Sequence, residues 1–101
     1  MTEPEALSTN DVTAAMEELH SDWTLTSGRL RRELTFGSFI DAFSFMTAIA
    51  IIAERIDHHP DWHNIERSIT IELSTYDSNG AITANDFALA THIDTVSARF
   101  I

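Results

Sequence analysis

Residues 39–60 read FIDAFSFMTAIAIIAERIDHHP, and this stretch decides much of the fold. Ser38 offers a helix N-cap, and apolar side chains then recur as far as Ile56. Pro60 cannot continue a helix and biases His59 toward an extended conformation. A helix is therefore predicted from Phe39 to about Ile56. Apolar residues cover most of its girth, so we expect one face to pack on a sheet and another on a partner helix or subunit.

Weaker patterns surround this helix. Ser8 and Asp11 have the spacing of a capping box, which predicts a helix over about 9–20. The segments 23–26 and 30–36 flank a Ser-Gly turn and are typical of a hairpin. Odd-numbered apolar positions from Ile65 to Leu73 predict a strand with one wet face. A turn over 77–80 and a second capping box, formed by Thr83 and Asp86, precede the last helix.

The expected order of elements is αββαβα. This order predicts an α+β fold in which an antiparallel sheet of four strands, or three plus an edge strand, has helices packed on one face. The length of 101 residues suits one domain over 1–101.

Composition excludes several classes of function. The formal charge of −10 comes from 16 acidic residues against six basic ones, all arginine, which disfavours nucleic acids and anionic membranes as partners. The absence of cysteine rules out disulfides, thiol nucleophiles and zinc–thiolate sites. The first residues lack the basic and apolar regions of a signal peptide, so we expect a cytoplasmic protein.

Titratable groups are densest around the predicted end of the long helix, at Glu54, Asp57, His58, His59, Asp61 and His63. Histidine can donate and accept protons near neutral pH, because its unperturbed pKa is about 6.5. Glu54 precedes His58 by one helical turn, so its carboxylate is expected to orient that imidazole and make it a proton donor. Two alternatives stay open: the histidines end a helix at the surface, or, less favoured, they bind a metal.

The segment 45–62, FMTAIAIIAERIDHHPDW, resembles the pterin-4a-carbinolamine dehydratase family, whose signature has an acidic residue, three intervening positions and then His-His-Pro. The resemblance extends over nearly the whole chain, from Trp23-Thr-Leu through Leu73-Ser-Thr75 and the Gly80 turn to Asp86-Phe-Ala-Leu-Ala90.

The resemblance implies removal of water from 4a-hydroxytetrahydropterin, giving the quinonoid dihydropterin, without a metal or bound cofactor. His58 would be the acid, His59 a second proton-transfer group, and Glu54 the residue that orients His58. The implied substrate-binding residues are Ser74, Thr75, Tyr76, Asp86 and Trp62. The resemblance also implies a homodimer that extends the sheet and pairs again through the long helix into a homotetramer.

Two positions depart from the family pattern. Tyr76 stands where the family usually has a third histidine, and Glu66 where it usually has an aromatic residue; both were expected on one strand. A phenol donates a hydrogen bond but is a poor base near neutral pH.

Structural roles are open beside the functional ones: helix capping for Asp86, and packing for Tyr76 and Trp62. Two other functions also stay open: a binding or assembly module for a protein partner on the same scaffold, and a site adapted to a different pterin.

Overall fold

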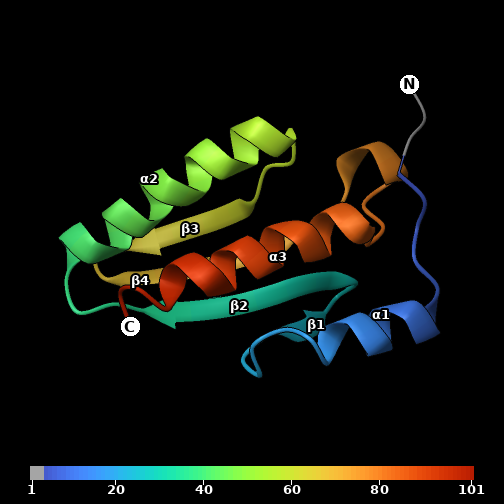
Figure 1. Ribbon diagram of the computed structural model, residues 1–101, viewed down its shortest axis with the longest axis horizontal. Coiled ribbons are helices and arrows are strands. Elements are labelled where there is room, and N and C mark those ends of the chain that lie inside the picture. The colour runs from blue at the N-terminus through green and yellow to red at the C-terminus, as the bar shows by residue number, and fades with distance from the viewer. Residues whose placement is uncertain (1–3) are drawn as a thin grey trace.

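The computed structural model describes residues 4–101, and Figure 1 shows two long helices lying across the same face of one sheet. The order of elements is α1 (Thr9–Met16), β1 (Thr24–Thr26), β2 (Arg29–Thr35), α2 (Phe39–Ile56), β3 (Asp61–Ile65), β4 (Ser68–Leu73), a short 3-10 turn η1 (Tyr76–Ser78) and α3 (Ala84–Ser97). The predicted fold class is confirmed, with one strand more than the expected order.

The four strands are antiparallel and lie in the order β1-β2-β4-β3. Along β4, Ile69, Ile71 and Leu73 are buried, while the residues between them lie on the wetter face. Phe45 and Ile49 of α2 are fully buried against this apolar surface, and Leu89 and Ile93 of α3 complete the core. Burial of this apolar area is the main favourable term that holds the helices on the sheet.

The extra strand, β3, lies in a stretch that the sequence analysis assigned in part to the next strand. The chain turns at Glu66, whose positive φ of 51° marks a left-handed conformation, so Ile65 ends β3 instead of starting β4. Glu66 therefore lies in the β3–β4 turn and Tyr76 in η1, and the expectation that they share one strand is wrong. β3 is an edge strand and has no buried residue. Its sequence therefore alternates only weakly between apolar and polar residues, and the strand was not predicted.

The first helix also ends earlier than the expected range of 9–20. Its N-cap is Ser8, as predicted, and α1 stops at Met16. Tighter backbone bonds from Glu18 to Ala15 and from Leu19 to Met16 then lead the chain toward β1.

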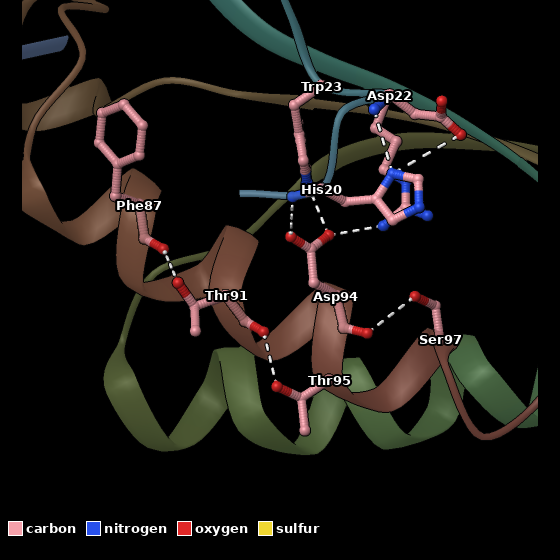
Figure 2. A network of polar contacts seen from close by, with 9 residues as sticks. His20, Asp22, Trp23, Phe87, Thr91, Asp94, Thr95 and Ser97 are labelled. Atoms are coloured by element: carbon pink, nitrogen blue, oxygen red, sulfur yellow. Dashed lines mark hydrogen bonds and ion pairs between the residues drawn. The ribbon is translucent and has the colours of Figure 1, made fainter. Parts of the chain in front are cut away.

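Asp94 of α3 holds this connection in place (Figure 2). Its carboxylate accepts hydrogen bonds from the backbone N–H of His20 at 2.9 Å and from the indole Nε1 of Trp23 at 2.7 Å. The same carboxylate pairs with the buried guanidinium of Arg32 on β2. One side chain thus ties the segment after α1 and the second strand to the last helix.

The long helix keeps a second apolar face that nothing in residues 4–101 covers. Phe39, Ile40, Phe43 and Ile51 are each more than half exposed. Within the same residues, no helix combines the length and hydropathy needed to cross a membrane.

Candidate functional site

The end of α2 creates the site. Asp57 follows the helix in the left-handed conformation, with φ 54° and ψ 44°, and its N–H bonds back to the carbonyls of Ala53 and Glu54. The N–H of His58 also returns to Ala53 O at 3.0 Å, so the helix closes with bonds from two successive residues. Two adjacent histidines therefore leave the helix in different surroundings: His58 is buried and His59 is exposed.

His58 is bound to Asp86 from the far end of the chain. Its Nε2 lies 2.6 Å from Oδ1 of Asp86, and the two side chains are 8% and 0% exposed. A carboxylate has only acceptors, so the imidazole donates from Nε2. Nδ1 of His58 has no hydrogen-bond partner within residues 4–101 and is the nitrogen left for proton exchange with a ligand.

Asp86 is itself fixed by two residues that precede the last helix in the chain. Its Oδ2 accepts from the hydroxyl of Thr75 at 2.8 Å and from the backbone N–H of Thr83 at 2.9 Å. Thr83 is the N-cap of α3, so the predicted capping box is present. Asp86 caps the helix and contacts His58 at the same time, because it uses Oδ2 for the cap and Oδ1 for the imidazole.

The expected pairing of Glu54 with His58 is wrong. Glu54 Oε1 instead lies 2.9 Å from Nε2 of His59, and both side chains are more than half exposed. The one-turn spacing holds only while the helix continues. Asp57 breaks that spacing by turning left-handed, which swings His58 inward and brings His59 over Glu54.

A hollow of about 370 Å³ opens beside His58 and lies within the size range of small-molecule sites. Its lining is polar and comes from four separate segments: Pro4, Asp57, His58, His59, Ser74, Thr75, Tyr76, Asp77 and Asn85. A neighbouring hollow of about 590 Å³ shares His59, Ser74, Tyr76 and Asp77 with it. The two hollows adjoin, because they share these lining residues. Figure 1 shows that the end of α2 and the start of α3 lie at the same end of the molecule.

Most residues predicted for the site come together here. His58, His59, Ser74, Thr75 and Tyr76 line the first hollow, with Glu54 behind His59 and Asp86 behind His58. Tyr76 is 93% exposed, so it forms a rim and not a strand-end packing residue. Trp62 is half-buried on β3, packs against the core and lines neither hollow.

Sequence reasoning missed Pro4, Asp77 and Asn85 as lining residues. Pro4 reaches the hollow because its carbonyl accepts a hydrogen bond from the Ser78 hydroxyl, and because Leu7 N–H bonds to Ile82 O at 2.9 Å. In Figure 1 the blue N-terminal segment passes beside the orange η1 turn. No local motif signals this long-range contact.

Charge in and around the hollow is mostly negative. Asp57 and Asp77 line it, and the one arginine of the neighbouring hollow, Arg29, is already paired with Asp61 at 2.9 Å. Within residues 4–101, no three His, Asp or Glu side chains are placed so that they could share a metal ion. The arrangement can hold a neutral polar ligand between two imidazoles and move protons at its edge.

Known proteins similar to this chain point to one family. The family model described as "Pterin 4 alpha carbinolamine dehydratase" matches residues 5–96. A protein of Solibacter usitatus named "Putative pterin-4-alpha-carbinolamine dehydratase" is 46% identical over 92 residues, which cover 91% of this chain and 95% of that protein. A protein of the same name from Mesorhizobium japonicum is 44% identical over 88 residues, covering 85% of this chain and 88% of that one.

Two solved structures share the fold. A transcriptional coactivator/pterin dehydratase from Brucella melitensis is 29% identical, with a TM-score of 0.85 over 91% of this chain and 98% of that one. A pterin dehydratase-like protein identified as a RuBisCO assembly factor in the alpha-carboxysome is 22% identical, with a TM-score of 0.65 over 77% of this chain and 92% of that one. The second likeness concerns the fold alone. With the family model spanning nearly the whole chain and the relatives so similar, this chain belongs to the pterin 4 alpha carbinolamine dehydratase family.

Proposed function

We propose that this protein dehydrates 4a-hydroxytetrahydropterin to the quinonoid dihydropterin, with His58 and His59 as the proton-transfer residues. One observation carries the proposal: His58 is buried and bound through Nε2 to Asp86, and it lines the same hollow as His59. An imidazole held in one orientation beside a ligand-sized hollow is the arrangement that general acid–base catalysis needs.

The reaction breaks one C–O bond and moves two protons. Protonated His58 donates from Nδ1 to the hydroxyl group on C4a, which leaves as water. His59 accepts the proton that a ring nitrogen loses as the new double bond forms. The substrate thus loses one hydroxyl and one proton, and the exposed His59 returns its proton to solvent while His58 regains one.

Glu54 takes a role different from the expected one. Because it contacts His59, it orients the second imidazole. This exposed pair is solvent-screened and contributes little to stability, so its value would lie in geometry.

Ser74 and Tyr76 supply the polar contacts to the pterin. Both line both hollows, and neither hydroxyl has a hydrogen-bond partner among residues 4–101. Tyr76, at the rim, can donate a hydrogen bond to a ring carbonyl or nitrogen.

A stopped-flow assay with purified protein and freshly generated 4a-hydroxytetrahydropterin tests the proposal. We expect the rate of dehydration to rise above the uncatalysed rate in proportion to protein concentration. A rate that is independent of protein concentration over the micromolar range would refute the proposed dehydratase activity.

A second function is favoured by a separate observation, the uncovered apolar face of α2. Phe39, Ile40, Phe43 and Ile51 form a surface that a soluble monomer would rarely leave exposed. We propose that a second copy of this chain covers it in a homodimer or homotetramer, and that the same face can receive another protein in an assembly role. The similar protein from Brucella melitensis is described as a transcriptional coactivator as well as a pterin dehydratase, which supports a protein-binding role for this scaffold.

Sedimentation of the wild-type protein and of Phe43→Glu tests this face. We expect the wild-type protein to be oligomeric and the variant to dissociate, because a charge would be buried at the interface. A monomeric wild-type protein would refute the proposed self-association. An oligomer unaffected by Phe43→Glu would show that the interface lies elsewhere.

A further inference from the structure

Thr75 is an unusual member of the hollow because every polar group it carries is already used within the protein. Its N–H bonds to Ala81 O at 2.9 Å, and its carbonyl accepts from Ser78 N–H at 3.1 Å and Gly80 N–H at 2.9 Å. Its hydroxyl donates to Asp86 Oδ2 at 2.8 Å. The residue is 3% exposed. Thr75 therefore has little left with which to bind a substrate, unlike the neighbouring Ser74, whose hydroxyl has no hydrogen-bond partner among residues 4–101.

The direction of the hydrogen bonds around Thr75 can be worked out from donor counts. Asp86 is a carboxylate and only accepts, so the single hydroxyl proton of Thr75 points to it. The contact of 2.7 Å between the hydroxyls of Thr75 and Thr83 must then be donated by Thr83. Thr83 Oγ1 in turn accepts from Asn85 N–H at 3.2 Å. The result is a one-way chain from the first turn of α3 through two hydroxyls to Asp86.

We infer that Thr75 is a positioning residue that acts through Asp86 to keep one proton on Nε2 of His58, so that Nδ1 is the nitrogen that gives up and regains the transferred proton and neutral His58 is the Nε2–H tautomer. The inference rests on the proposed dehydratase function for its kinetic consequence, but not for its structural one. Aligned donors in a buried chain polarise one another, which strengthens the hold on the carboxylate. With Oδ2 fixed by Thr75 and Thr83, Oδ1 is left in one place to receive His58.

The kinetic test replaces Thr75 by valine, which keeps the shape and removes the hydroxyl. We expect kcat to fall about 3- to 30-fold with KM within about twofold, since the lost contact acts on the imidazole and not on the bound pterin. Thr75→Ser restores the hydroxyl and should recover the wild-type kcat to within about twofold. A rise in KM at constant kcat would overturn the inference in favour of direct substrate binding.

The control is Thr91→Val on α3, the helix that carries Asp86. The Thr91 hydroxyl donates to a backbone carbonyl, that of Phe87, at 2.9 Å (Figure 2). It takes no part in the chain of hydrogen bonds that reaches Asp86. This variant should leave kcat and KM unchanged. A fall in kcat equal to that of Thr75→Val would mean that any lost threonine hydroxyl perturbs α3, and the inference would fail.

An NMR measurement separates this inference from the proposed function. Long-range 1H–15N spectra of neutral His58 should show the proton on Nε2 alone in the wild-type protein and in Thr91→Val, and a mixture of tautomers in Thr75→Val. The wild-type spectrum decides the tautomer even if Thr75→Val does not fold, since a proton on Nδ1 would overturn the inference. An inactive protein that still shows this tautomer would refute the dehydratase and leave the positioning role intact.

Discussion

The imidazole of His58 and the carboxylate of Asp86 lie 2.6 Å apart, although 28 residues separate them in the chain. His58 follows the C-cap of α2, and Asp86 lies in the first turn of α3. Two helix termini therefore meet at a single buried contact, which joins the stability of α3 to the geometry of the proposed proton donor.

Replacing Asp86 by asparagine should lower both the stability of α3 and the activity that depends on the position of His58. The amide keeps one acceptor for the Thr83 N–H or the His58 ring but cannot serve all three donors without placing its NH₂ against one of them. We expect the free energy of unfolding to fall by about 1–3 kcal/mol, measured by urea denaturation, because a buried donor loses its partner. In the stopped-flow assay kcat should fall at least about 10²-fold. A variant with wild-type kcat would show that the carboxylate only caps the helix.

The N-terminal segment should contribute to pterin binding. Ser78→Ala removes the hydrogen bond that holds Pro4 at the wall of the hollow. We expect KM to rise about 2- to 10-fold with kcat unchanged, as suits the loss of one hydrogen bond. Thr95→Ala, which removes a hydroxyl bonded only within α3, is the control and should not change KM. Equal KM values for all three proteins would contradict a binding role for this wall.

Tyr76→His tests whether the departure from the family pattern limits the rate. Position 76 lines the same hollow as His59, so an imidazole there would add a base within the site. We expect the rate to rise by a factor of about 3–10, below the roughly 10²–10⁴-fold that a fully positioned acid–base group contributes, because position 76 lies at the exposed rim. An unchanged or lower rate would mean that the tyrosine is not a defect.

Asp94 should be a large determinant of stability. Asp94→Ala leaves the buried guanidinium of Arg32 without its counter-ion and the Trp23 indole without its acceptor. Breaking a buried ion pair from one side costs about 3–5 kcal/mol. The midpoint of thermal unfolding should fall by more than about 10 °C, measured by calorimetry.

The exposed pair of Arg31 and Glu33 provides the control for Asp94. Glu33 is largely exposed, and its contact of 2.7 Å with Arg31 lies at the surface. Glu33→Ala should therefore change the free energy of unfolding by less than about 1 kcal/mol. Similar losses for Asp94→Ala and Glu33→Ala would show that burial of Arg32 is not what matters.

Sequence reasoning predicted the helices best where local chemistry sets their ends. The N-cap Ser38 and the break before Pro60 define α2 from Phe39 to Ile56, and the capping box of Thr83 and Asp86 defines the start of α3. These signals are local, because capping depends on residues within one turn. The edge strand β3 gave no such signal, since none of its residues is buried.

The sequence predicted the residue types of the candidate site but predicted one of their contacts wrongly. The spacing of Glu54 and His58 suggested a contact, but the left-handed Asp57 between them decides the pairing and is not visible in the sequence. The contact of His58 with Asp86 joins distant segments and depends on how α3 packs beside α2. The Pro4 wall depends likewise on tertiary structure alone.

The central claim is that His58 transfers a proton in the dehydration of a hydroxylated pterin. The most direct test compares His58→Ala with His63→Ala, an exposed histidine on β3 that lines neither hollow, in the stopped-flow assay. We predict a loss of at least about 10²-fold in kcat for His58→Ala and none for His63→Ala, with both proteins folded by circular dichroism. Equal kcat values for the two variants would contradict the claim.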